Sequence, residues 1–280
     1  MAYDYEFLDV AIDGRLATVT ISNPPINLMT VPLASELARL SEELKADDAL
    51  TVVLLKSADP DFFLAHFDVA AILEFPTNTD AQRDMELSWF HQMCERYRTM
   101  NKVTIAQIEG RVGGGGSELA SSFDMRFGVI DKTTVCQMEV PLGILPGGSG
   151  TQRLPRLLGR GRAMEVVLGG DDLDAATAER WGYLNRIYPA QEIGGAVLKL
   201  AQRIASFPPE AVRLAKEAVN GADQSSLEDG LRDESYLFQR LLRTDSAQRN
   251  MQRFLEIGGQ TREGELRVGE LGAELGDSQQ

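Results

Sequence analysis

The sequence predicts an α/β fold, and two observations lead to this prediction. In the first half, the β-branched runs Leu16 to Ile21 and Leu50 to Lys56 flank a segment whose leucines recur at helical spacing from Leu33 to Leu44. In the second half, after the loop PLGILPGGSG, the periodicity is mostly helical. An opening of strand, helix and strand followed by helices is typical of a layered α/β domain with helical additions.

The middle of the chain continues this alternation. We expect a helix from about Ala81 to Thr99, a strand from Val103 to Ile108, a glycine loop followed by a helix, and short strands at Phe127 to Ile130 and Thr133 to Gln137. Helices follow near Gln152, Ala163 and Ala175, and over Glu192 to Ser206, Pro209 to Val219, Leu227 to Leu242 and Ser246 to Ile257. Beyond Gly258 the chain is polar, acidic and rich in glycine, which predicts a mobile tail.

Composition indicates a soluble globular protein. A chain of 280 residues buries about three quarters of its unfolded surface, so its core needs neither disulfides nor a metal. Cys94 and Cys136 lie among apolar residues without a Cys-x-x-Cys spacing, and we interpret them as buried thiols in a reducing compartment. The N-terminus is acidic and no apolar run approaches membrane-spanning length, so we expect a cytoplasmic protein that does not associate with membranes.

The charge balance narrows the class of partner. With 42 acidic against 28 basic residues, the formal charge of −14 repels polyanions at long range and disfavours nucleic-acid binding. A small polyanionic ligand is still compatible with this field if local arginines, lysines or backbone amides hold it.

The glycine run from Gly113 to Gly116 is the most informative stretch. It follows the strand that ends at Ile108 and precedes a segment, Ser117 to Phe123, that can begin a helix. Glycines allow a close backbone approach, and the amides of a helix N-terminus favour a negative ligand atom. We expect Glu118 in the first helical turn, where a carboxylate can either complement the helix dipole or act in catalysis.

A second loop that leads into a helix lies within Ala58 to Ile72. Its amides, around His66 to Val69, could face the same anion as the glycine run. For His66 we weigh a packed, hydrogen-bonded side chain against direct chemistry, and we interpret Asp68 as a helix N-cap. His91 is interpreted as structural.

The third candidate is Glu139, which stands between a predicted strand and a proline–glycine loop. Alone it is compatible with a solvated loop residue or a cap. Together with Glu118 it could act in acid–base catalysis, because one carboxylate can activate a water while another delivers a proton. The sequence does not reveal whether the two glutamates face one cavity.

Four blocks, in order, resemble the crotonase superfamily, the enoyl-CoA hydratases and isomerases. They are AHFD at Ala65 to Asp68, GRVGGGGSELASSFD at Gly110 to Asp124, MEVPLGILPGGSGTQRLPRLLG at Met138 to Gly159, and PPEAVRLAKEAVN at Pro208 to Asn220. The resemblance runs from about Leu16 to Asn220 and implies a spiral of repeated ββα turns closed by C-terminal helices. It also implies a homotrimer, or a hexamer built as a dimer of trimers.

The resemblance further implies an acyl-CoA substrate, with coenzyme A present only as part of that substrate and no metal or redox cofactor. In this family two backbone N–H groups bind the thioester oxyanion, and the positions that correspond to them in this chain are Phe67 and Gly115. Glu118 would activate the water that attacks the β-carbon, and Glu139 in its acid form would supply the α-proton. The remaining matched substrate-binding positions are Ala65, His66, Asp68 and Gly114.

Glutamates at both matched positions favour the hydratases, since the familiar isomerases usually keep only the one that matches Glu139. We therefore expect an enoyl-CoA hydratase, with the isomerase as the nearest alternative. A thioester hydrolase or decarboxylase, or a non-catalytic binding protein, stays open. RNA binding, known for a few relatives, is disfavoured by the acidic chain.

Three positions depart from the family pattern. His66 and Phe67 replace a small Gly-Ala pair, and Ala70 stands where a lysine is common. Lys56 and Lys216 are candidates for holding the coenzyme A phosphates. We expect a spiral core over residues 1–200, a helical trimerisation region over 201–259 and a flexible tail over 260–280.

Overall fold

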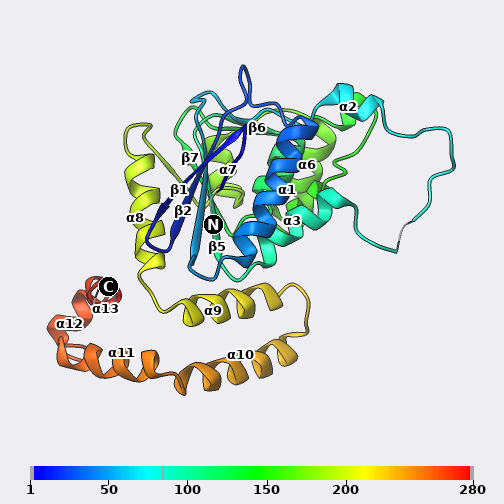
Figure 1. Cartoon of the computed structure of the whole chain (residues 1–280). Helices are drawn as coiled ribbons and strands as arrows, with labels where there is room; N and C mark the ends of the chain where they lie inside the picture. Colours follow the sequence, from blue (N-terminus) through cyan, green and yellow to red (C-terminus); the bar gives the residue numbers. More distant parts are fainter. Residues whose placement is uncertain (1–2, 84, 278–280) are drawn as a thin grey trace.

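The computed structural model describes residues 3–83 and 85–277. Its centre is a six-stranded sheet with the order β1-β2-β3-β5-β7-β10 (Figure 1). The strands are β1 (Leu8–Asp13), β2 (Leu16–Ile21), β3 (Val52–Ser57), β5 (Val103–Ile108), β7 (Met125–Val129) and β10 (Arg186–Tyr188). Only β1 runs antiparallel to its neighbour; the other pairs are parallel.

A smaller sheet has the order β4-β6-β8-β9. Its strands are β4 (Phe62–Leu64), β6 (Arg111–Gly113), β8 (Thr134–Cys136) and β9 (Leu173–Asp174). The chain passes from the large sheet to the small one three times, from β3 to β4, from β5 to β6 and from β7 to β8. Each passage is followed by a helix, which confirms the spiral of ββα turns.

Fourteen helical elements surround or extend the two sheets within the described residues. Those of the spiral are α1 (Val31–Ala46), α2 (Val69–Leu73), α3 (Trp89–Thr99), α4 (Gly114–Ala120), the 3-10 turn η1 (Val140–Leu142), α5 (Gly150–Leu158), α6 (Arg160–Gly169), α7 (Ala175–Trp181) and α8 (Ile193–Ala205). The C-terminal helices are α9 (Pro209–Gly221), α10 (Leu227–Leu242), α11 (Asp245–Glu256), α12 (Arg262–Leu266) and α13 (Val268–Asp277).

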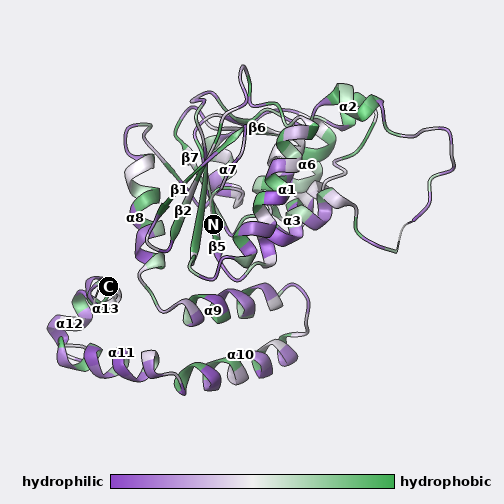
Figure 2. Ribbon diagram, in the orientation of Figure 1, coloured by the Kyte–Doolittle hydropathy of each residue, from purple (hydrophilic) through white to green (hydrophobic). Residues whose placement is uncertain are grey.

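The inner strands of the large sheet, β2, β3, β5 and β7, are buried on both faces. Helix α1 covers one face because Leu33, Leu37, Leu40 and Leu44 recur on one side of it, and all four are fully buried. Helix α8 covers the other face, where Val197 packs with Leu54 and Ile105. In Figure 2 the strands of this sheet carry the hydrophobic colour, as expected for parallel strands covered on both sides.

Two helix boundaries differ from the prediction. The expected helix from Ala81 begins only at Trp89, because Ser88 Oγ accepts the N–H of His91 and caps the helix there. The expected helix after the glycine run begins at Gly114, inside the run, so Glu118 lies in the second turn instead of the first. The predicted strands at Leu16, Val103, Phe127 and Thr133 are confirmed within a few residues.

The C-terminal segment forms two helices, α12 and α13, where the sequence predicted a mobile tail. Leu271 is fully buried, and Arg203 of α8 donates to the Gly269 carbonyl at 2.7 Å. One buried leucine and one hydrogen bond thus hold this glycine-rich segment against neighbouring helices. None of the helices that the structure describes is both long and apolar enough to cross a membrane.

Candidate active site

Glu118 lies on α4 and points toward a loop that the sequence places 30 residues later. The backbone N–H groups of Gly148 and Gly150 each donate to its Oε1 atom at 2.8 Å. We call residues 147–150 the clamp loop. A Cβ atom on Gly148 would lie 2.5 Å from Glu118 Oε2 and 2.5 Å from Phe90 Cε1, so any other residue here requires the loop or these two side chains to move.

Burial is the main influence on the Glu118 carboxyl, which is 4 % exposed. Burial raises the pKa of Glu118 to about 7, and the charge of Glu139 acts in the same direction. The two clamp-loop amides and Arg153 oppose this rise because they stabilise the carboxylate. Both protonation states of Glu118 are therefore accessible near neutral pH.

Glu139 follows β8 and starts the turn η1. Its carboxylate accepts from Gln137 Nε2 at 3.1 Å and 3.3 Å, and the side chain of Gln137 is itself buried. Burial raises the pKa of Glu139, against the lowering effect of hydrogen bonds and of the nearby His66. Both glutamates are thus displaced toward their acid forms, although different groups hold them.

The two glutamates line one cavity of about 410 Å³, which we call the glutamate cavity. Its wall is mostly apolar and carries three rings in mutual contact, with centroid distances of 6.4 Å from Phe67 to Trp89 and 5.6 Å from Trp89 to Phe90. The lining residues are Phe67, Ile72, Phe75, Ser88, Trp89, Phe90, His91, Gly115, Glu118, Glu139, Ile144, Leu145, Gly147 and Gly148.

Two backbone amides meet at this wall, those of Phe67 and Gly115. Gly115 is the second residue of α4, so its N–H has no acceptor within the helix. Met29 and Phe67 lie side by side in a parallel bridge, in which the Met29 N–H donates to the His66 carbonyl and the Asp68 N–H donates to the Met29 carbonyl. The Phe67 N–H takes no part in this bridge. A Cβ atom built on Gly115 would lie 3.6 Å from the Phe67 nitrogen, so the two amides are neighbours.

The other predicted substrate-binding residues lie behind or beside the glutamate cavity. Ala65 is 5 % exposed and donates its N–H to Asn27, and Asp68 caps α2 through the Ala70 N–H at 2.9 Å, as the sequence suggested. His66 Nδ1 lies 2.8 Å from the Phe67 carbonyl oxygen. A Cβ atom on Gly114 would approach Glu139 Oε1 to 3.0 Å, so Gly114 borders the second glutamate.

The sequence missed His91 and its aromatic neighbours. We interpreted His91 as structural, yet it lines the glutamate cavity at the first turn of α3, with Nδ1 2.7 Å from Ser88 Oγ. The signal was available in the run from Trp89 to His91, three large ring side chains ahead of the buried stripe formed by Met93, Cys94 and Tyr97. That stripe faces the core, so the three ring side chains in the first turn of α3 point to other sides of the helix and border the cavity.

One of the two candidate lysines is unavailable to a ligand. Lys216 Nζ lies 2.8 Å from Asp124 and donates to the Lys102 carbonyl at 2.7 Å, and its side chain is 8 % exposed. It therefore stabilises the packing of α9 on the spiral. Lys56 lies on β3 and is half-buried. Cys94 and Cys136 are free and buried, as predicted.

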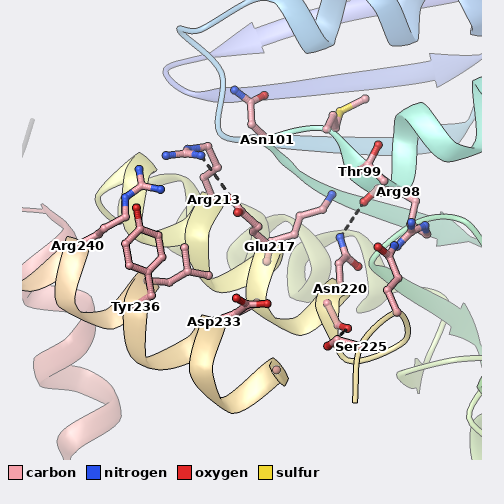
Figure 3. Close-up of a pocket in the computed structure, with 17 residues that line it drawn as sticks. Arg98, Thr99, Asn101, Arg213, Glu217, Asn220, Ser225, Asp233, Tyr236 and Arg240 are labelled. Carbon is pink, nitrogen blue, oxygen red and sulfur yellow. Dashed lines mark hydrogen bonds and ion pairs between the residues drawn. The ribbon is translucent and has the colours of Figure 1, made fainter. Parts of the chain in front are cut away.

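A larger pocket, of about 580 Å³, lies between α9, α10 and the end of α3 (Figure 3). It contains neither glutamate. Its charges are mixed and partly paired with each other, for example Arg213 with Glu217 at 3.6 Å, and Asn220 donates to the Arg98 carbonyl. Such a wall offers no convergent set of groups for one ligand, so the glutamate cavity is the better candidate active site.

Comparison with known proteins places the chain in a family. The family model for enoyl-CoA hydratase/isomerase matches residues 11–262. The chain is 32 % identical over 254 residues to the crotonyl-CoA hydratase of Syntrophomonas wolfei, covering 90 % of this chain and 96 % of that protein. It is 31 % identical over 245 residues to the short-chain-enoyl-CoA hydratase of Clostridium acetobutylicum, covering 87 % and 92 %.

Among solved structures, the enoyl-CoA hydratase of Bacillus anthracis superposes with a TM-score of 0.82 at 27 % identity, over 90 % of this chain and 96 % of that one. The chain belongs to the enoyl-CoA hydratase/isomerase family. The family is shared by hydratases and isomerases, and the arrangement of the two glutamates bears on which reaction this member carries out.

Proposed function

We propose that this protein is an enoyl-CoA hydratase, which adds water across the α,β double bond of a 2-enoyl-CoA thioester. The observation that carries the proposal is the pair of buried glutamates at one cavity, beside the two adjacent amides of Phe67 and Gly115. An isomerase needs to move one proton, whereas hydration needs a base for water and an acid for the α-carbon.

In the proposed reaction the thioester oxygen accepts hydrogen bonds from the two amides. Attack of water on the β-carbon moves electron density onto that oxygen, and one well-placed donor typically stabilises such a transition state by ~3 kcal/mol. Glu118 takes a proton from the attacking water as the C–O bond forms. Glu139 gives its proton to the α-carbon. The substrate thus gains one hydroxyl group and one hydrogen, while Glu118 gains a proton from the water and Glu139 loses one to the substrate, so the two glutamates together carry one proton before and after the step.

The environment of each glutamate supports its role. The clamp-loop amides fix the orientation of Glu118 and stabilise its carboxylate, which suits a base. Burial raises the pKa of both glutamates, which at Glu139 favours the acid form that a donor requires, while at Glu118 the two clamp-loop amides and Arg153 oppose the rise. The thioester itself supplies the activation, so the proposed reaction uses coenzyme A only as part of the substrate and no metal or redox cofactor.

The substrate class is an acyl-CoA with an apolar acyl group. The rings of Phe67, Trp89 and Phe90 with Ile144 and Leu145 provide an apolar wall for the acyl chain. Lys56 is the remaining candidate, of the two lysines considered, for the coenzyme A phosphates. The cytoplasmic location predicted from the sequence stays a prediction.

The proposed assembly is a homotrimer or a hexamer. Helices α10 and α11 extend away from the two sheets in Figure 1 and carry large apolar side chains that are exposed in one chain. These are Leu227, Leu231, Tyr236, Phe238, Met251 and Leu255. Large apolar side chains exposed along two consecutive helices are typical of a surface that a partner covers, and a neighbouring copy would bury them. Light scattering at micromolar concentration should give three or six chains, and a stable monomer would contradict this assembly.

The direct test of function follows the absorbance of the conjugated thioester with crotonyl-CoA and longer 2-enoyl-CoAs. Loss of absorbance and a 3-hydroxyacyl-CoA product are expected. The isomerase alternative predicts no hydrated product and a shifted double bond when a 3-enoyl-CoA is supplied. Release of free coenzyme A would instead indicate a thioester hydrolase.

A further inference from the structure

The clamp loop contains one residue in a backbone conformation that side chains disfavour. Ser149 has φ of +113° and ψ of −5°. Residues with a Cβ atom rarely adopt this left-handed region, whereas glycine adopts it readily. Ser149 stands between Gly148 and Gly150, whose N–H groups both donate to Glu118. The conformation of Ser149, together with that of Gly148, therefore sets the direction of the two donors relative to each other.

The Ser149 side chain is held by Arg153. Although Ser149 occupies the N-cap position of α5, its hydroxyl makes no capping hydrogen bond. Its Oγ instead accepts from Arg153 Nε at 2.9 Å, and its carbonyl accepts from the Arg153 N–H at 2.9 Å. Arg153 thus binds Ser149 through both the side chain and the backbone.

Arg153 is itself anchored from α3. Its second terminal nitrogen lies 2.5 Å from Glu95, and Glu95 also pairs with Arg98 at 2.8 Å. Burial acts to raise the pKa of Glu95, but hydrogen bonds from Arg98 and Arg153 hold it below the usual range, so the pair is ionised at neutral pH. The Arg153 side chain is only 13 % exposed, which limits its alternative orientations.

We propose that Arg153 is a positioning residue for Glu118: anchored by Glu95, it holds Ser149 in the left-handed conformation that aims both clamp-loop amides at the carboxylate. This inference rests on the proposed role of Glu118 as the base. Because the two amides stabilise the ionised form, a relaxed clamp loop raises the pKa of Glu118 and leaves its carboxylate less well oriented.

Other titratable groups around Glu118 bear on the same equilibrium. They are Glu139, Arg153, Cys94, Tyr183 and His91. Burial raises the pKa of both Cys94 and Tyr183 to about 12, so both are uncharged at neutral pH. The Arg153 charge also lowers the pKa of Glu118 directly, so a test must separate charge from positioning.

Two substitutions at Ser149 make this separation, since both remove the hydroxyl and leave the Arg153 charge. In Ser149→Ala the Cβ atom and the backbone hydrogen bond to the Arg153 N–H remain, but the Arg153 side chain no longer holds the residue. We therefore expect kcat for hydration to fall about tenfold and the acidic limb of the pH profile to move to higher pH. In Ser149→Gly the residue adopts the left-handed conformation without help from the Arg153 side chain, because glycine has no Cβ atom. Its kcat should therefore stay at least several-fold above that of Ser149→Ala.

Arg153→Lys keeps the positive charge but cannot bind Ser149 and Glu95 through a planar fork. It should behave like Ser149→Ala, and adding Ser149→Gly should restore most of the lost kcat and the position of the acidic limb. Arg156→Lys is the matched control, because Arg156 lies on the same helix but, within the described part of the chain, makes no hydrogen bond with Ser149 or Glu95. It should change neither kcat nor the position of the acidic limb. Circular dichroism verifies that each variant is folded.

An infrared titration of the Glu118 carboxyl, assigned by difference against Glu118→Gln, gives a readout that does not require turnover. If the wild-type protein is inactive on every 2-enoyl-CoA, the proposed function is overturned. The titration still tests whether Arg153 positions the clamp loop, because it does not depend on turnover. Equal values of kcat and Glu118 pKa in Ser149→Ala and Ser149→Gly overturn the positioning role. So does a loss in Arg153→Lys that Ser149→Gly does not rescue.

Discussion

Glu118 and Glu139 share one cavity, yet they are held by different kinds of donor. Glu118 receives two backbone N–H groups at 2.8 Å from a loop distant in sequence. Glu139 instead receives donors from its immediate neighbourhood, namely its own backbone N–H and the side-chain amide of Gln137 at 3.1 Å or more. The first carboxylate is therefore oriented by a loop that folds back from a distant part of the chain, and the second by groups within two residues of it.

The difference matches the two tasks of hydration. A base must present a fixed carboxylate to a water, and misplacement by an ångström can cost about a hundredfold in rate. A proton donor must instead be kept in its acid form until the α-carbon is ready, which burial of Glu139 favours. Each prediction below removes or changes one side of this comparison, starting with the largest expected effect.

The largest effect should come from removing either carboxylate. Glu118→Gln and Glu139→Gln keep the shape and abolish the base or the acid, so hydration of crotonyl-CoA should fall by roughly a hundred to ten-thousandfold in each. The losses should not add in the double variant, because the two groups act on one water and one proton. If hydration persists in Glu118→Gln while double-bond migration depends on Glu139, the isomerase assignment replaces ours.

The next effect should come from the clamp loop. Gly148→Ala places a methyl group 2.5 Å from Glu118 Oε2 and from Phe90, so the loop and the carboxylate must move apart. We expect kcat to fall by up to about a hundredfold with little change in KM. Gly161→Ala on α6, where a methyl group meets nothing within 4 Å, is the matched control. A Gly148→Ala variant with normal kcat would show that the loop does not hold Glu118 in solution.

The pH dependence separates the two carboxylates more finely. With the pKa of Glu118 near 7, its base form is lost as the pH falls, so kcat should drop about fivefold between pH 7 and pH 6. As the pH rises through the pKa of Glu139, which burial raises, kcat should fall because the proton donor is lost. The charge of Glu139 raises the pKa of Glu118, so an infrared titration of Glu118 should move to lower pH in Glu139→Gln. A Glu118 titration that is unchanged in this variant would mean that the carboxylates are not coupled.

The sequence predicted more of the fold than of the site, for a physical reason. The strand Leu16–Ile21 and the leucine stripe of α1 follow from periodicity, because their burial patterns repeat every two or about four residues. The start of α3 did not, because a single hydroxyl, that of Ser88, ends a segment whose composition otherwise permits a helix. Local capping outweighs average propensity at such boundaries.

Within the site, the pairing of Glu118 with Glu139 was anticipated, but their partners were not. The donors to Glu118 are backbone groups, and no residue type marks a backbone amide that turns toward a carboxylate 30 residues earlier. Lys216, which looked free in the sequence, is already paired with Asp124. Contacts between distant segments depend on loop conformation, and a single sequence carries little information about it.

The smallest expected effects concern the two residues that replace the family's small pair. In Phe67→Ala the backbone N–H remains, so hydration should persist, while loss of a ring from the aromatic wall should widen the range of accepted acyl groups. The measurement is kcat/KM along a series of 2-enoyl-CoAs of increasing bulk. If a folded Phe67→Ala protein lost all activity, the ring itself would be required.

His66→Ala should be milder still, because the His66 ring lies beside the reacting carboxylates without lining the cavity among the described residues. His66 lowers the pKa of Glu139, so its removal should raise that pKa and move the alkaline limb of the pH profile to higher pH. At neutral pH kcat should change by no more than about threefold, since the proton donor becomes, if anything, better populated. A fall of about a hundredfold at every pH would make His66 a catalytic group, and the reaction would then use three acid–base residues in place of two.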